Sequence, residues 1–165
     1  MARGNGIIVE GVEPGGKFVE GIIGTGLTLY PGSVVQIQVA TALVGGRWTW
    51  EVYNVAADGS RPSGPYILLL DDGYQGKLAT ASYGAGERAF GYIPKAGDEL
   101  NVLLANIAGT GDDHTKGEVL IVDDTTGKFI ATTGSPETEV AQLNETITDP
   151  TADQLVWVTW TGYEQ

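Results

Sequence analysis

Residues 117–134 carry the side chains most suggestive of chemistry. The stretch reads GEVLIVDDTTGKFIATTG and places two carboxylates, two hydroxyls and a lysine between apolar runs. A phosphate-binding loop needs an earlier glycine and a helix after Gly-Lys-Ser/Thr, because backbone amides hold the phosphates. Gly127 and Lys128 lack that glycine, and the FIAT that follows is typical of a strand. Residues 124–127 instead match a type I turn with glycine in the left-handed position, which predicts a hairpin bend.

Other acidic pairs could bind a cation or act in glycoside hydrolysis. Asp71–Asp72 and Asp112–Asp113, the latter followed by His114, offer oxygen and imidazole ligands. Neither stretch has the spaced pattern of a calcium loop, and aspartate is a common turn residue. Glycoside hydrolysis needs two acids at a fixed separation in a cleft, and no nucleophile signature lies near the histidine. We therefore predict no enzyme activity, no catalytic residue, no metal site and no cofactor.

Two tryptophans could form a sugar-binding platform. Trp48 and Trp50 alternate with polar residues in RWTWEVYNV, so they share one face of a predicted strand. Core packing is the favoured interpretation, since large aromatic side chains dominate β cores. If the strand were exposed, a carbohydrate-binding or adhesion module on a virion or cell surface would be the alternative function.

The charge and composition limit the classes of partner. The formal net charge is −12, from 21 acidic and 9 basic residues, and the chain has no cysteine. Such a surface repels phosphate backbones, so we expect no nucleic-acid partner. Disulfides and cysteine-ligated metals are excluded. No apolar run reaches about 18 residues, and the N-terminus lacks the features of a signal peptide, so we expect a soluble chain made in the cytoplasm, with no membrane partner.

The elements that must position these residues are strands. Runs rich in Val, Ile, Thr, Tyr and Trp are separated by frequent turn signals, which favours an all-β barrel or sandwich. YILLL, residues 66–70, lacks alternation and predicts a strand covered on both faces. Residues 29–165 are expected to form a single β domain. The glycine-studded residues 1–28 are expected to be an extended N-terminal arm or edge strands.

Two pairs of similar segments suggest two related β halves. LLLDDGYQGKLAT (68–80) resembles LIVDDTTGKFIAT (120–132), with an apolar triplet, Asp-Asp and Gly-Lys in the same order. YPGSVVQI (30–37) similarly resembles IPKAGDELNV (93–102), because each has a proline, then a glycine, then a predicted strand. We interpret these likenesses as an internal repeat, although turn chemistry alone can produce them.

The second half also resembles a known family. AGERAFGYIPKAGDELNVLLA, followed by GEVLIVDDTTGKFIATTGSPE, resembles the capsid decoration (cement) proteins of tailed bacteriophages, over about residues 61–163. The resemblance implies a small β-barrel-like virion protein on the outside of an icosahedral capsid. It further implies a homotrimer that binds the major capsid protein at joints between subunits and stabilises the shell, without enzymatic activity or a cofactor.

Two sets of residues are candidates for contact with partners. The apolar residues of the N-terminal lead are candidates for capsid contact. A tryptophan lies on each face of the last strand, where Val158 and Trp160 alternate with Trp157 and Thr159, so that strand is a candidate for subunit contact. The candidate contact residues are Phe18, Val19, Ile22, Ile23, Leu27, Trp157 and Trp160. Core packing is the competing interpretation for both sets.

Overall fold

The structure is a computed structural model of the chain, and it describes part of the sequence. Within the described residues, no helix has the length and apolar character needed to cross a bilayer. The described residues are 16–38, 44–53, 65–72, 75, 80–106, 113–131, 139–148 and 150–162.

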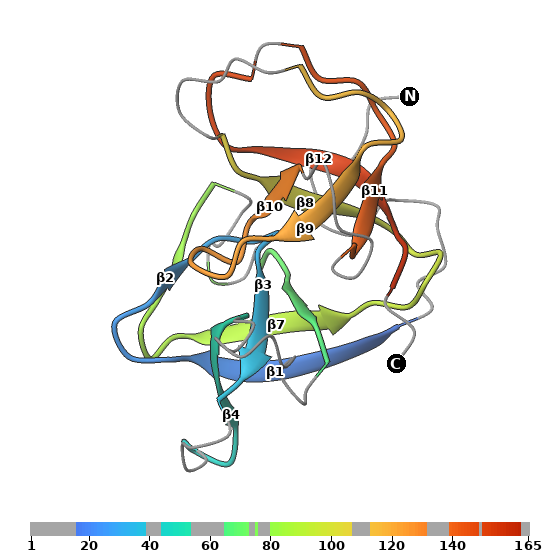
Figure 1. Ribbon diagram of the computed structural model, residues 1–165. Helices are drawn as coiled ribbons and strands as arrows, with labels where there is room; N and C mark the ends of the chain where they lie inside the picture. Colours follow the sequence, from blue (N-terminus) through green and yellow to red (C-terminus); the bar gives the residue numbers. More distant parts are fainter. Residues whose placement is uncertain are drawn as a thin grey trace.

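The first half of the chain forms a closed barrel of five strands (Figure 1). Its order around the barrel is β1-β4-β3-β5-β7, and β1 pairs in parallel with β4 and antiparallel with β7. The strands are β1 (Lys17–Ile23), β3 (Val34–Ile37), β4 (Trp48–Val52), β5 (Ile67–Leu69) and β7 (Arg88–Ile93).

The second half forms another closed barrel of five strands, drawn in olive to red in Figure 1. Its order is β10-β8-β12-β11-β9, and β8 pairs in parallel with β10 and antiparallel with β12. The strands are β8 (Glu99–Leu104), β9 (Val119–Val122), β10 (Phe129–Ala131), β11 (Ala141–Leu143) and β12 (Gln154–Trp160).

The two barrels share one pattern of connections. In each, the first strand pairs in parallel with the third and antiparallel with the fifth, and the second pairs with the third and fourth. The fourth strand pairs with the fifth in both barrels. The prediction of an all-β barrel with two related halves is therefore confirmed.

The alignment by which we inferred the repeat is nevertheless wrong. The sequence likeness matched β5 with β9 and β3 with β8, whereas the topology makes β3 equivalent to β9 and β5 equivalent to β11. The matched segments share Pro-Gly and Asp-Asp turn chemistry, which recurs wherever a strand begins or ends. The likeness therefore reflected common turns, while the true repeat lies in the order of strand pairing.

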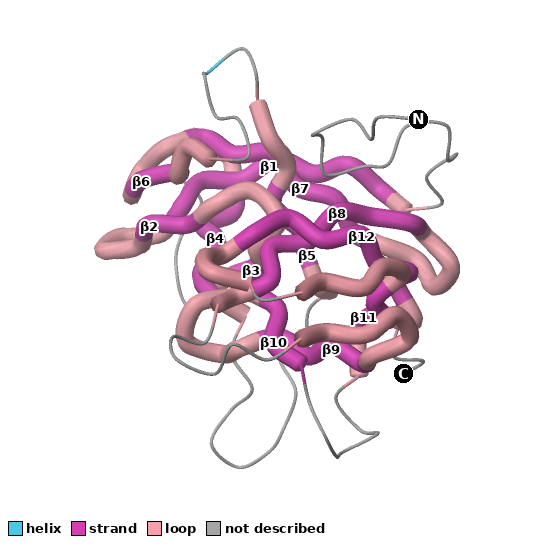
Figure 2. The backbone as a smooth tube through the Cα atoms, turned by 90° about the horizontal axis from the view of Figure 1, so that it is seen from above, coloured by secondary structure: helices cyan, strands magenta, loops and turns pink. Residues whose placement is uncertain are grey.

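A small third sheet projects from the first barrel. It consists of β2 (Thr28–Leu29) and β6 (Tyr83–Gly84), which pair antiparallel and lie side by side at one end of the molecule in Figure 2. The Tyr83 hydroxyl donates a hydrogen bond to the Leu70 carbonyl at 2.8 Å, and burial raises the pKa of this phenol. These contacts join the small sheet to the end of β5.

Two hydrophobic cores hold the structure together, and one of them spans both barrels. The smaller core contains Ile67 and Leu69 of β5. The larger core contains buried residues of the second barrel together with Val34, Leu68 and Tyr92 of the first. β5 thus buries one face inside its own barrel and the other against the second barrel, which confirms the predicted strand covered on both faces.

The described part of the N-terminal lead is not an arm. Residues 17–23 form β1, which has a hydrogen-bonded neighbour on each side and is therefore not an edge strand. Residues 24–27 lead into β2. The expected arm or edge strands do not extend over residues 17–23, because this strand closes the first barrel. Residues 1–15 lie outside the described residues.

Candidate functional site

The acidic and hydroxyl residues between β9 and β10 form a hairpin bend. β9 and β10 pair antiparallel, and residues 124–126 form the turn between them. The Gly127 amide donates to the Asp123 carbonyl at 2.8 Å, and Gly127 has a φ of 70°. A left-handed conformation at this position favours glycine, so the predicted hairpin bend with a left-handed Gly127 is confirmed. The Thr126 hydroxyl donates to the Asp123 carboxylate at 2.5 Å and further orders the bend.

This bend contacts the first barrel through its backbone. The Val34 amide donates a hydrogen bond to the Gly127 carbonyl at 2.7 Å, and the Leu103 amide donates to the Gly32 carbonyl at 2.9 Å. A Cβ added to Gly127 would lie 2.5 Å from the Val34 carbonyl oxygen, and one added to Gly32 would lie 2.8 Å from the Leu103 nitrogen. The two glycines therefore permit a backbone approach that joins the barrels.

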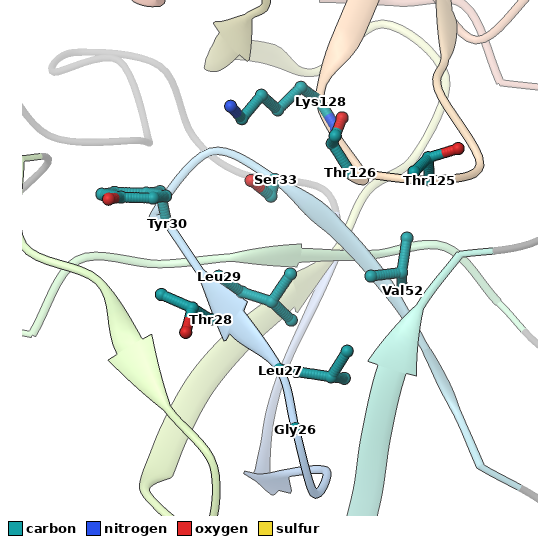
Figure 3. A pocket seen from close by; sticks show the side chains of 10 residues that line it. All are labelled: Gly26, Leu27, Thr28, Leu29, Tyr30, Ser33, Val52, Thr125, Thr126 and Lys128. Atoms are coloured by element: carbon teal, nitrogen blue, oxygen red, sulfur yellow. The ribbon is translucent and has the colours of Figure 1, made fainter.

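A pocket of about 180 Å³ lies beside this junction (Figure 3). In Figure 3, the β9–β10 turn forms one side and the segment around β2 forms the other. The pocket is thus built from both barrels. Its lining residues are Gly26, Leu27, Thr28, Leu29, Tyr30, Ser33, Val52, Thr125, Thr126 and Lys128.

The pocket contains one cationic side chain, whose charge is already paired. Lys128 Nζ lies 2.5 Å from Asp153 Oδ2 and 6.0 Å from the centre of the Tyr30 ring. Burial acts to raise the pKa of Asp153. The hydrogen bonds from Lys128 and from the Asn106 amide outweigh that effect and hold this pKa below its usual range. The carboxylate therefore stays ionised near neutral pH and neutralises the lysine.

The outer face of the first barrel carries a second charged group. Glu20 of β1 forms ion pairs with Arg47 and with Arg88, the latter at 2.7 Å. The hydrogen bond from Arg47 is the largest contribution that holds the pKa of Glu20 below its usual value. Arg88 also lies over the Phe90 ring at 4.8 Å. The ion pairs join β1 to Arg88 in β7 and to Arg47, which directly precedes β4.

The candidate contact residues of the N-terminal lead differ in how exposed their side chains are. Phe18 is 62% exposed and packs at 5.3 Å against Tyr92, so it is available to a partner. Val19 and Ile22 are half-buried, and Leu27 lines the pocket. Ile23 is 1% exposed and belongs to the core of the first barrel, which leaves it no surface for capsid contact.

The two tryptophans of β12 also differ. The alternation predicted for this strand is present, with Val158 and Trp160 buried. Trp160 is 2% exposed and packs edge-on against Tyr66 and Phe129 in the shared core, so the structure gives it the competing core role. Trp157 is half-buried on the other face.

Trp48 and Trp50 do not form a sugar-binding platform. Trp50 is 1% exposed and lies in the core of the first barrel, whereas Trp48 is 48% exposed at the start of β4. The core interpretation therefore holds for Trp50, and Trp48 is the half-exposed ring of the pair.

The described residues of the acidic pairs, Asp71, Asp72 and Asp113, and His114 do not line the pocket. His114 Nδ1 is 3.1 Å from Glu118 Oε2, and the His114 backbone pairs with Ile147. Asp72 accepts a hydrogen bond at 2.6 Å from Gln75 Nε2. In the part of the chain that the structure describes, no three His, Cys, Asp or Glu side chains are grouped to hold a metal ion. Asp112 lies outside the described residues.

Sequence reasoning missed the pocket residues that come from the first barrel. Thr28, Tyr30 and Ser33 flank a Pro-Gly turn that was interpreted only as the start of a strand. A dense group of hydroxyl side chains around this turn was the available signal. Nothing in the linear order placed it against residues 125–128.

The fold is therefore a pair of closed five-stranded barrels whose strands pair in the same order. No protein-family description matches the sequence, and no curated protein matches it either. Among solved structures, the chain is similar to the N base of head fiber gp8.5 in bacteriophage phi29, with a TM-score of 0.51 and 11% sequence identity. The similarity covers 91% of this chain and 99% of that chain. At 11% sequence identity, the comparison shows a shared fold alone.

Proposed function

We propose that this protein is a structural component of a bacteriophage virion, attached to the outside of the icosahedral head. The observation that carries the proposal is the fold shared with a phage head fiber base over 91% of the chain. The resemblance of residues 61–163 to capsid decoration proteins points to the same class of function. The proposed role requires no enzyme activity and no cofactor.

In the finer proposal, the protein binds the major capsid protein at joints between capsid subunits and assembles as a trimer. Binding that favours the assembled shell over separated subunits stabilises the shell by mass action. A trimer engages equivalent sites together, so a weak single contact becomes a strong attachment. The net charge of −12 disfavours nucleic acid as the partner. The protein would be made in the host cytoplasm, without membrane attachment.

Phe18 is the residue that we assign to capsid contact. Its side chain is 62% exposed on β1, next to the ion pair between Glu20 and Arg88. Aromatic residues, Phe among them, are enriched at protein interfaces, and a few residues carry most of the binding free energy. Ile23 and Trp160 are not included in this surface because both are buried.

The direct test is to locate the chain in a cryo-EM map of the phage particle encoded with it. We expect density on the outside of the capsid, above joints between major capsid proteins, with three-fold clustering. Light scattering of the purified protein should give the mass of a trimer. Absence from the particle, or a position inside the head, would contradict the proposal.

A second test concerns the contact residue. Phe18→Ser should reduce co-sedimentation with expanded capsids by about tenfold or more, as expected for an interface hot spot. Trp48→Ala is the matched control, because it removes another exposed aromatic ring from the same barrel. Thermal melts should establish that both variants remain folded. Equal loss of binding in both variants would show that Phe18 has no specific role in capsid contact.

A further inference from the structure

The outward side of β1 carries an aromatic ring and a charged group together. Alternate residues of a strand point to opposite sides of the sheet. Ile23 lies in the core of the first barrel, and a Cβ added to Gly21 would clash with the Trp50 ring, so these two positions face inward. Phe18 and Glu20 therefore face outward. This outward side, together with the arginines that bind Glu20, is called the β1 face below.

Two arginines, one on each side of β1, bind the same carboxylate. Arg88 lies in β7, which runs beside β1 in Figure 1, and its Nη2 donates to Glu20 Oε2 at 2.7 Å. Arg47 directly precedes β4, and its Nε donates to the other oxygen, Oε1. A guanidinium group carries several N–H donors, so Glu20 engages only part of each arginine. Both arginines keep donors for a second carboxylate.

The β1 face is positively charged on an acidic protein. Its two arginines outnumber its single glutamate, whereas the whole chain has a formal net charge of −12. The side chains of Arg47 and Arg88 are 40% and 48% exposed, against 28% for Glu20, so the cations are the more accessible part of the group.

Two further acids of the same strands are bound away from the arginines. Glu51 of β4 accepts a hydrogen bond from Gln36 Nε2 at 2.8 Å. Glu87, which precedes β7, accepts one from the Gly84 amide at 2.6 Å. The positive charge of the β1 face is therefore compensated by Glu20 alone among these carboxylates.

We propose that the β1 face binds an acidic surface of the major capsid protein, with a carboxylate of that partner held by Arg47 and Arg88. Guanidinium groups bind carboxylates through paired, charge-assisted hydrogen bonds, and their shared contact with Glu20 holds both arginines in place beforehand. The exposed Phe18 ring packs against apolar side chains of the same partner surface. This inference rests on the proposed function, because it takes the capsid as the partner, and it adds the charge of the surface that is contacted.

The attraction acts at short range. Beyond a Debye length of about 8–10 Å, the net charge of −12 repels an acidic partner, and salt screens that repulsion. A guanidinium–carboxylate contact enclosed in an interface is screened much less. Salt therefore changes two opposing contributions to the binding free energy, and single substitutions report the sign of the partner's charge more directly.

The test measures co-sedimentation of the full chain with expanded capsids of the phage encoded with it. Arg47→Gln and Arg88→Gln should each weaken binding about tenfold, since a hydrogen bond between charged groups is lost. Lys116→Gln is the matched control, because it removes one positive charge from an exposed side chain before β9, and it should bind like the unaltered chain. Thermal melts should establish that the variants remain folded.

Glu20→Gln tests the sign of the partner's charge. This variant should bind capsids at least as tightly as the unaltered chain, because the partner carboxylate no longer competes with Glu20 for the two arginines. Weaker binding of Glu20→Gln together with tighter binding of the arginine variants would indicate a basic partner surface and overturn the proposal.

Two other results would also overturn it. One is binding by the arginine variants that equals that of Lys116→Gln, which would leave the proposed function standing and remove this inference alone. The other is a loss of the trimer in light scattering of the arginine variants, which would make a second copy of this chain the occupant of the β1 face. Failure of the unaltered chain to bind capsids would contradict the proposed function itself.

Discussion

At the scale of single residues, Tyr92 links the two barrels where β7 leads into β8. Its hydroxyl donates to Asp98 Oδ2 at 2.6 Å and accepts from the Gly16 amide at the same distance. The Lys95 amide also donates to this Asp98 oxygen, at 2.8 Å. Burial is the main reason that the pKa of Tyr92 rises to about 12, and the Asp98 hydrogen bond adds to the rise. The phenol therefore stabilises the junction in its protonated form.

Replacing Tyr92 by Phe should destabilise the protein by about 2 kcal/mol, because a charged hydrogen bond is lost. Because the pKa is higher in the folded state than the ordinary 10, the contribution of the phenol is complete below pH 10. It is lost as pH rises from 10 toward 12. Urea unfolding across this range should show the two proteins converging in stability. A constant difference would contradict the assignment.

Gly127 provides a second prediction at this scale, because it combines a positive φ with a close backbone approach. Gly127→Ala should cost at least about 3 kcal/mol, since strain at a left-handed position adds to a clash with the Val34 carbonyl. Gly117→Ala is the matched control. Its φ is 93°, but an added Cβ would meet nothing within 4 Å. Urea titrations should give a clearly smaller loss for the control, and equal losses would show that the approach to Val34 is unimportant.

At the scale of elements, β1 is the strand whose role the sequence concealed. It is the neighbour of β4 and of β7, so both sides of the strand are hydrogen-bonded. Removal of residues 1–28 should therefore open the first barrel and abolish cooperative folding, measured by circular dichroism and by proteolysis. Removal of residues 1–15 is the control, since it takes away no described strand. A folded protein after the longer deletion would contradict the closed barrel.

Local patterns predicted the elements better than their partners. The uninterrupted apolar run of β5 indicated cover on both faces, and the residues before Gly127 indicated the β9–β10 hairpin. The partners of β1 lie far along the chain, and its glycine-rich surroundings suggested a flexible lead. The pocket depends on Ser33 and Lys128, which are 128 − 33 = 95 positions apart. Such long-range pairing follows from tertiary packing, which periodicity does not encode.

At the scale of the whole molecule, the two barrels depend on one another. Val34, Leu68 and Tyr92 of the first barrel are fully buried in the core that also contains Leu120 and Phe129 of the second. Separation of the barrels would expose these side chains to water, at a cost of roughly 1.5–3 kcal/mol for each large apolar residue. Backbone hydrogen bonds at Gly32 and Gly127 also cross the junction. A shared core of this kind favours a single cooperative unit.

We therefore expect both barrels to unfold in one transition, although each is a closed sheet. Trp50→Phe removes the buried reporter of the first barrel, and Trp160→Phe removes the one in the shared core. In urea, the fluorescence of each variant should follow its circular dichroism with one midpoint, because neither barrel keeps its core without the other. Residues 94–165 expressed alone should remain unfolded for the same reason. Two separated transitions, or a folded isolated half, would mean that the repeated barrel is an independent domain and that the junction only tethers it.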